Sequence, residues 1–168
     1  MEIWDLYDEN KNITGKTMIR GEEIPDNFYH LVVHIWIKNN DGKYLISQRS
    51  KSKKSNPLKW ECQGGSVLLG ESSIEAAIRE TKEEVGIDLN NIKGNLVYTK
   101  TRKIINNEKF NDIMDIWLFN YDGEVDLNKA TTDEVCDYKW LTKEEIKKLF
   151  DNKELVQSLD YFFNEINI

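Results

Sequence analysis

Apolar residues gather into short runs over the first part of the chain, and these runs predict β-strands. Residues 31–37 (LVVHIWI) are almost entirely apolar, which is typical of a strand in the middle of a sheet. The sequence from Asn39 to Gly42 favours a tight turn, so residues 43–49 are predicted to return as a hairpin partner. Residues 2–20 alternate around a polar turn, which predicts two more short strands.

The second half of the chain combines strands with helices. Residues 96–103 and 113–121 are predicted strands, and the polar residues 105–112 are predicted to form the loop that joins them. The sequence TKEE, which begins at Thr142, is a capping box that predicts the start of a helix. Residues 152–166 place apolar side chains at helical spacing, which predicts core packing through Leu155, Val156, Leu159, Phe162, Phe163 and Ile166.

Residues 65–87 (GSVLLGESSIEAAIRETKEEVGI) predict a turn followed by one helix. Ser72 or Ser73 is suited to cap its start, because a short hydroxyl side chain accepts a bond from the first backbone N–H groups. Gly86 is suited to end it, because a left-handed residue is usually needed there. Four positions at helical spacing predict a buried stripe, namely Ile74, Ile78, Thr81 and Val85.

The same helix carries three carboxylates on another face. Glu80, Glu83 and Glu84 stand at i, i+3 and i+4, so they are neighbours that repel one another. A hard divalent cation relieves this repulsion, because Mg²⁺ and Mn²⁺ prefer oxygen ligands. The spacing therefore indicates a metal site on the helix.

These residues resemble the signature of the Nudix hydrolases. The pattern is filled by Gly65, Glu71, Arg79, Glu80, Glu83, Glu84, Gly86 and Ile87, and it departs from the family only at Thr81, which takes an apolar slot. The resemblance covers about residues 29–150. It implies an α+β fold, the Nudix α/β/α sandwich with a mixed sheet between helices. We expect one domain over residues 1–168, with a β extension at 1–28 and C-terminal helices at 142–168.

The family resemblance implies hydrolysis of a diphosphate linked to another group, X. In this view Glu80 and Glu84 bind Mg²⁺ or Mn²⁺ together with the carbonyl of Gly64. Glu83 is either a further ligand or the group that accepts a proton from the attacking water. Arg79 is expected to orient the glutamates and to pair with Glu71, because its planar guanidinium can hold carboxylates at two points.

Two further acids are candidates for an additional metal ligand or for the general base. Many relatives carry an acid at the entrance of a later strand that adds a metal ligand or a base, and Asp112 resembles it. Glu134, in the loop before residues 137–141, is the rival for the base. The sequence leaves both open, and either acid is also suited to a solvated loop.

Residues 49–60 form a basic loop that leads toward residues 65–87, the segment with the Nudix signature, which is called the box below. We expect Arg49 and Lys54 to bind the diphosphate, because they lie near the ends of the loop, and Trp60 to contribute to substrate binding. The alternative is a solvated loop without a ligand. The histidines at positions 30 and 34 share one face of a strand, and packing beside the sheet is favoured over metal binding.

The composition and charge of the chain limit its possible binding partners. The chain has 168 residues, 39% of them hydrophobic, which is enough for a core. Its net charge of −7 argues against nucleic-acid polymers and membranes as partners. The family resemblance implies a small-molecule diphosphate as the substrate. Cys62 and Cys136 show no disulfide spacing, and no signal peptide or bilayer-spanning run is evident. A cytoplasmic location is expected, and a homodimer is left open.

The scaffold also resembles the Nudix branch that includes isopentenyl diphosphate isomerase. That enzyme needs a cysteine and, two residues later, a metal-binding histidine; these slots hold Gly64 and Ser66 here, and Cys62 is displaced by two positions. His30 matches one isomerase histidine, but the partner position holds Glu23. Three hypotheses follow: a Mg²⁺-dependent pyrophosphohydrolase, which is preferred, an isoprenoid diphosphate isomerase, and a non-catalytic nucleotide sensor.

Overall fold

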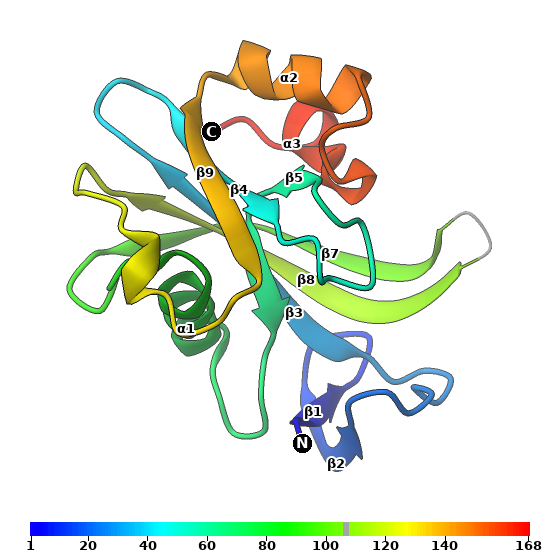
Figure 1. The fold of residues 1–168 in the computed structure, drawn as a ribbon. Helices are drawn as coiled ribbons and strands as arrows, with labels where there is room; N and C mark the ends of the chain where they lie inside the picture. The colour runs from blue at the N-terminus through cyan, green and yellow to red at the C-terminus, as the bar shows by residue number, and fades with distance from the viewer. Residues whose placement is uncertain (106–107) are drawn as a thin grey trace.

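The structure, a computed structural model, describes residues 1–105 and 108–168, and two sheets run through it. In the larger sheet the strands follow the order β5-β4-β3-β8-β7, with β6 beside β3 and β9 beside β4 (Figure 1). These strands are β3 (His30–Lys38), β4 (Tyr44–Arg49), β5 (Trp60–Glu61), β6 (Gln63–Ser66), β7 (Gly94–Ile105), β8 (Glu108–Asn120) and β9 (Val135–Leu141). The smaller sheet pairs β1 (Ile3–Tyr7) with β2 (Ile13–Ile19).

Helices cover both faces of the larger sheet. Helix α1 (Ser73–Val85) lies on one face, and α2 (Lys143–Asp151) and α3 (Tyr161–Asn164) lie on the other (Figure 1). Short 3₁₀ turns are η1 (Leu127–Lys129) and η2 (Gln157–Leu159). The predicted α/β/α sandwich with a mixed sheet is confirmed, because β3 is parallel to β8 and antiparallel to β6 and β4.

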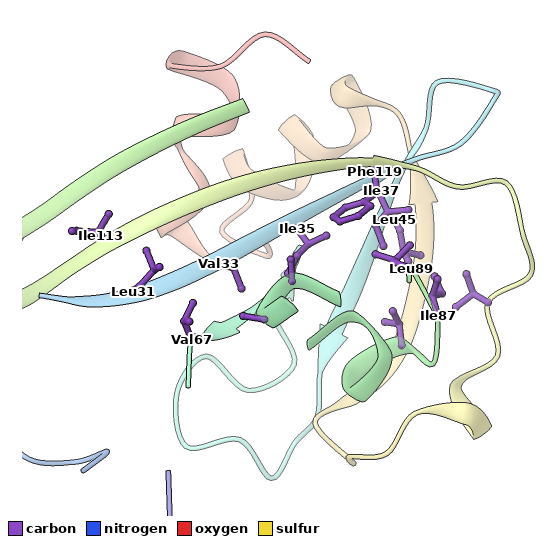
Figure 2. Packing of buried hydrophobic residues seen from close by; sticks show 14 of the residues in the cluster. Leu31, Val33, Ile35, Ile37, Leu45, Val67, Ile87, Leu89, Ile113 and Phe119 are labelled. Atoms are coloured by element: carbon purple, nitrogen blue, oxygen red, sulfur yellow. The ribbon is translucent and has the colours of Figure 1, made fainter. Parts of the chain in front are cut away.

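Strand β3 is the centre of the core. Its odd-numbered residues, from Leu31 to Ile37, point to the side of α1 and pack with Ala76 and Ala77 (Figure 2). Its fully buried Trp36 points to the other side and stacks on Phe162 of α3, with ring centroids 3.8 Å apart. This double burial explains why residues 31–37 have no polar face and confirms their prediction as a central strand.

Helix α1 begins and ends where local sequence rules place its ends. Ser72 is the N-cap: its hydroxyl accepts a bond from the backbone N–H of Glu75, whose carboxylate accepts one from the N–H of Ser72. Gly86 ends the helix in the left-handed conformation with φ of 74°. The predicted stripe is only partly right. Thr81 is buried with Ala76 and Ala77, because small side chains allow a close approach to the sheet, whereas the larger isoleucines at 74 and 78 are half-buried.

The structural predictions for two segments were wrong. The predicted loop at 105–112 belongs mostly to the β7–β8 hairpin: β7 runs to Ile105 and β8 starts at Glu108, while residues 106–107 lie outside the described residues. The polar residues Asn111 and Asp112 are buried in this ribbon, so it has no apolar–polar alternation and its strand character is invisible in the sequence pattern.

The predicted helix over residues 152–166 is also wrong, and its predicted core packing is only partly right. Leu155, Leu159 and Phe162 are buried, Phe163 and Ile166 are half-buried against the same core, and Val156 is half-buried outside it. Residues 154–156 run beside β5, where the N–H of Trp60 donates to the carbonyl of Glu154 at 2.9 Å and the N–H of Val156 donates to the carbonyl of Trp60 at 2.9 Å. These bonds to a strand replace helical bonds, so only η2 and the single turn of α3 remain.

The N-terminal sheet is fastened to the rest of the protein at several points. The backbones of Tyr7 and Tyr29 exchange bonds of 2.8 and 3.0 Å, and the side chain of Asp5 accepts a 2.8 Å bond from the N–H of Gly70. Lys11 reaches from the β1–β2 turn to the fully buried carboxylate of Asp115 in β8, with Nζ–O distances of 2.5 and 2.7 Å.

The Lys11–Asp115 pair generates a stability prediction. Lys11→Met should lower the free energy of unfolding by about 1–3 kcal/mol, because it leaves a buried carboxylate without its cation, discounted for the partial exposure of the lysine. Equilibrium unfolding in urea measures the change. Lys11→Met combined with Asp115→Asn should regain part of the loss, and no difference between wild type and Lys11→Met would contradict the proposed clamp.

Candidate active site

A cavity of about 280 Å³ lies where β6 meets α1. Its floor holds the box residues and its rim carries basic and acidic residues from loops. Of the residues predicted for the site, the structure brings seven together here: Arg49, Gly64, Arg79, Glu80, Glu83, Glu84 and Glu134. Residues of the box and of distant loops thus line one concave surface that combines carboxylates with cations.

Arg79 holds the carboxylates of the floor in place. Its Nε and Nη2 donate to both oxygens of Glu71 at 2.7 and 2.9 Å, and its Nη1 donates to Glu80 at 2.8 Å and to Glu83 at 3.2 Å. Nη2 also donates to the carbonyl of Ser66 at 2.9 Å, which ties α1 to β6. Burial opposes the charge of Arg79, but the carboxylates of Glu71 and Glu80 outweigh it and raise its pKa.

The two glycines of β6 make room for this arrangement. A Cβ atom on Gly65 would overlap the carboxyl group of Glu80, and one on Gly64 would lie 2.5 Å from the carbonyl oxygen of Val33. The N–H of Gly64 donates to Glu84 at 3.2 Å. Larger residues would therefore displace the strand or the carboxylates, so the tight approach depends on glycine at both positions.

Glu84 is the most deeply buried carboxylate of the cavity, with 6% of its surface exposed. Burial, followed by the negative charges of Glu61 and Glu80, raises its pKa well above the usual range. Burial also raises the pKa of Glu80, although Arg79 works in the opposite direction. The ionised form of Glu84 is poorly stabilised by the protein alone, because Arg79 pairs with Glu80 and makes no ion pair with Glu84 among the described residues.

This donor set fits a divalent cation. Glu80, Glu83, Glu84 and the backbone of Gly64 line one cavity, and oxygen ligands are those that Mg²⁺ and Mn²⁺ prefer. Within the described part of the chain, no three acidic, histidine or cysteine side chains are drawn together into a ready metal cluster. The carboxylates of Glu80 and Glu83 are turned toward Arg79 instead, so a cation would compete with this arginine for them.

Two loops close the rim of the cavity. Lys53 forms an ion pair with Glu134, and the N–H of Ser50 donates to the carbonyl of Glu134 at 2.7 Å. The N–H groups of Thr131 and Thr132 donate to the carbonyl of Glu83 at 3.0 and 3.2 Å, which anchors the second loop on α1. The rim is thus fixed to the same helix that supplies the floor.

Three predicted residues lie outside the cavity lining. The side chain of Lys54 is exposed, and the neighbouring Lys53 lines the cavity in its place. Trp60 is 6% exposed because it packs in the core on the α3 side of the sheet, with Lys139 above its ring. Asp112 is 3% exposed within β8, where Arg102 holds it through bonds of 2.7 and 2.6 Å.

The two histidines of β3 have packing partners. His30 stacks on Trp4, with ring centroids 4.4 Å apart. Nδ1 of His34 lies 2.8 Å from the hydroxyl of Tyr161. Burial, assisted by the positive charge of Arg102, lowers the pKa of His34 to about 3, so its ring is neutral at pH 7.

Sequence reasoning missed three charged rim residues. One is Lys53, because the prediction named its neighbour Lys54. The other two, Glu2 and Arg20, directly flank the strands of the N-terminal sheet and pair at 2.8 Å. No motif marks either of the N-terminal residues. The anchoring of β1 to the turn before α1, which includes the 2.8 Å bond from the N–H of Leu69 to the carbonyl of Ile3, brings them to the cavity.

Comparison with known proteins identifies the family. The NUDIX domain model matches residues 28–162. An uncharacterized Nudix hydrolase of Listeria innocua is 40% identical over 166 residues, which cover 97% of this chain and 91% of that protein. The chain therefore belongs to the NUDIX family and is a Nudix hydrolase, an enzyme for phosphoanhydride bonds.

Two further likenesses define the scaffold. A crystal structure from Deinococcus radiodurans shares the fold with a TM-score of 0.71 and 22% identity, and the match covers 92% of each chain. An isopentenyl-diphosphate Delta-isomerase of Citrobacter koseri is 29% identical over 143 residues, which cover 80% of this chain and 74% of that protein. None of the described helices has both the length and the apolar character that a membrane span requires.

The raised pKa of Glu84 predicts how pH changes stability. Above the usual glutamate pKa of about 4.3, the unfolded chain loses this proton while the folded protein keeps it, so stability falls as pH rises until Glu84 is ionised in both states. In EDTA, Glu84→Gln should remove this loss and raise the melting temperature at pH 7–8, by about 2–4 °C for each kcal/mol gained.

Thermal unfolding between pH 5 and 8 measures the effect, with the exposed Glu9→Gln as the control. Added Mn²⁺ or Mg²⁺ should raise the melting temperature of the wild type and have a smaller effect on Glu84→Gln. Equal melting curves for wild type and Glu84→Gln at every pH would contradict the unfavourable burial of this acid.

The contacts of Arg79 predict that the planar shape of its guanidinium contributes to stability as well as its charge. Arg79→Lys should lower the free energy of unfolding by about 1–3 kcal/mol, because an ammonium group cannot hold Glu71 at two points and reach the other carboxylates together. Urea unfolding measures this loss. The matched control is Arg20→Lys, whose exposed pair should change stability by less than about 0.5 kcal/mol; equal effects would refute the special role of Arg79.

Proposed function

We propose that the protein is a Mg²⁺-dependent pyrophosphohydrolase that cleaves the diphosphate linkage of a nucleoside diphosphate derivative or a similar small diphosphate. One observation carries the proposal: Glu80, Glu83 and Glu84 share a single cavity with the cations Arg49 and Lys53. Carboxylates suit the cation that a phosphoryl-transfer enzyme needs, and basic side chains at the rim suit its anionic substrate.

Mg²⁺, or Mn²⁺ in its place, would be held by Glu80, Glu84 and the carbonyl of Gly64, with Glu83 as a further oxygen donor. When bound, such an ion offsets the negative charge of phosphate oxygens and lowers the pKa of a water molecule. The contribution of the protein is to preposition these donors. Arg79 holds Glu80 and Glu83 at the cavity before any ligand arrives, and a bound ion would replace the arginine at the carboxylate oxygens that it takes.

The rim is suited to grip the diphosphate. Arg49 is held by Glu61 at 2.7 Å and by the carbonyl of Ser55 at 2.9 Å, so its guanidinium is already oriented at the edge of the cavity. Lys53 is paired with Glu134 in this structure, and an incoming phosphate offers it a second anionic partner. We assign Lys53 the role that sequence analysis gave to Lys54.

We assign Glu134 as the general base, with Glu83 as the alternative. In hydrolysis the oxygen of a water molecule bonds to phosphorus, the bond from phosphorus to the bridging oxygen breaks, and one proton of the water passes to the base and then to solvent. Glu134 lines the cavity with the box carboxylates, which supports this role, whereas Asp112 is occupied by Arg102. Movement of Lys53 to the phosphate would leave Glu134 able to accept the proton.

The isomerase alternative has less support. Its cysteine and histidine slots hold Gly64 and Ser66, and Cys62 is 4% exposed in the core rather than in the cavity lining. Burial and the charge of Glu61 also raise the pKa of the Cys62 thiol, which keeps it unreactive. The complete carboxylate set argues in turn against a non-catalytic sensor. A free Cys62 and Cys136 suit a reducing compartment, so we propose a cytoplasmic location.

A panel of diphosphates tests the proposal. Purified protein is incubated with ADP-ribose, dinucleoside polyphosphates, nucleoside diphosphates and isopentenyl diphosphate, with Mg²⁺ or with EDTA, and products are separated by chromatography. Cleavage of a phosphoanhydride bond in Mg²⁺ alone is the expected result. Glu84→Gln and Glu134→Gln should each lower kcat by about 10²-fold or more, since general-base and charge-stabilising groups contribute at this level.

The control for these variants is Glu9→Gln, an exposed carboxylate in the β1–β2 turn. If Glu134→Gln keeps full activity while Glu84→Gln loses it, Glu83 rather than Glu134 is the general base. Formation of the allylic isomer of isopentenyl diphosphate would favour the isomerase, and an absence of cleavage across the panel would refute the hydrolase proposal.

A further inference from the structure

The side chain of Gln63 in β6 is fully buried and makes no hydrogen bond. Its exposed fraction is 0%, and both Oε1 and Nε2 of its amide lack a partner among the described residues. Buried polar groups are almost always paired, because an unpaired one is costly in the folded protein. Thr81 of α1 is also fully buried and polar, but its hydroxyl donates to the carbonyl of Ala77 at 2.8 Å. Packing alone therefore does not explain an amide at position 63.

The side chain of Gln63 points toward α1. It lies directly opposite Ile35 of β3, and residues opposite each other in a sheet share a face. Ile35 packs on the side of α1 (Figure 2). Gly65, two residues after Gln63, gives the same result, because a Cβ atom there would overlap the carboxyl group of Glu80. The amide of Gln63 is therefore enclosed between β6 and the helix that carries the box carboxylates.

Glu84 lies at the level of Gln63 along this contact. Gly65 lies against Glu80, and the N–H of the preceding Gly64 donates to the next turn of the helix, to Glu84, at 3.2 Å. The strand and the helix therefore run in opposite directions here. From Gly65 back to Gln63 the strand covers about 7 Å. From Glu80 on to Glu84 the helix covers about 6 Å, so the two steps match.

Gln63 and Glu84 each lack what the other has. The Glu84 carboxylate is 6% exposed, and the N–H of Gly64 is the one hydrogen-bond donor that the described residues give it. Glu80, in contrast, accepts a 2.8 Å bond from Arg79. A side chain that binds a metal ion usually receives a further hydrogen bond that fixes its orientation. The amide of Gln63 has two free N–H groups for such a bond.

We propose that Gln63 is a positioning residue for Glu84, whose carboxylate accepts a hydrogen bond from the Gln63 amide when it binds the divalent cation. This bond orients the carboxylate and offsets part of its charge in a buried place. The inference rests on the proposed function, because it concerns the cation that the proposed hydrolase needs. The unpaired amide is a cost in stability that serves the metal site.

Gln63→Met tests this role, because methionine has a similar length and no amide. In EDTA the variant should melt about 2–6 °C above the wild type, since an unpaired buried amide is removed. Its affinity for Mn²⁺, measured by electron paramagnetic resonance of the free ion, should fall about tenfold, since a group that orients a metal ligand is lost. A residue with a structural role alone would change only the melting temperature.

A double-mutant cycle tests whether Gln63 acts through Glu84. Glu84→Gln lowers the Mn²⁺ affinity by itself, and adding Gln63→Met should lower it by less than about twofold further, because the shared partner is already lost. The matched control is Thr81→Val, which removes a fully buried hydroxyl that already has a partner in the helix. This variant should bind Mn²⁺ like the wild type.

Gln63→Asn keeps the amide but shortens its reach, so it should also weaken Mn²⁺ binding, and it decides the outcome if Gln63→Met does not fold. An affinity within about twofold of the wild type would overturn the positioning role. If Mn²⁺ binding depends on Gln63 but no diphosphate is cleaved, the positioning role stands and the proposed function falls. Cleavage with an Mn²⁺ affinity that is independent of Gln63 gives the reverse, and a wild type that binds no Mn²⁺ overturns both.

Discussion

The contacts of one guanidinium with three carboxylates are the constraint on which this site depends. Arg79 joins the box turn, through Glu71 and the carbonyl of Ser66, to the helix face that carries Glu80 and Glu83. Without a cation among them these carboxylates would repel one another at helical spacing. The arginine therefore makes the acidic surface compatible with folding and sets the orientation of the side chains that the proposed chemistry uses.

Glu84 shows the limit of this compensation. It lies deeper than the other box carboxylates, and the described contacts give it the N–H of Gly64 rather than a cation. Its ionised form is therefore costly in the folded protein, a cost that a bound divalent ion would offset. Stability and function conflict at this residue, which is a common property of sites built for charged ligands.

The remainder of the fold supports the same small region. The N-terminal sheet lies ahead of the matched NUDIX residues 28–162, yet Asp5 binds the backbone of Gly70 in the box turn. On the other side, the loop at 130–134 is bonded to the end of α1 and to Ser50. The acidic floor of the cavity thus faces a rim whose cations are held by acids, as in the pairs Arg49–Glu61 and Lys53–Glu134.

The sequence by itself determined the box, the family and the ends of α1. Capping at Ser72, termination at Gly86 and the shared face of the carboxylates depend on spacings of three or four residues, so local rules are sufficient. The central strand was also predictable, because a strand buried on both faces has an apolar run that no exposed segment shows.

Tertiary structure decided what distant segments share. Whether Lys53 or Lys54 faces the cavity depends on how the loop packs against Glu134, and the inward position of Trp60 depends on the residues 154–156 that pair with β5. The same strand contact replaced the helix expected near the C-terminus. Asp112 lies opposite Arg102 in the β7–β8 hairpin, which the polar sequence of this segment did not predict. In each case the deciding contact joins residues far apart in the chain, and the free energy of such contacts leaves no periodic signal in the sequence.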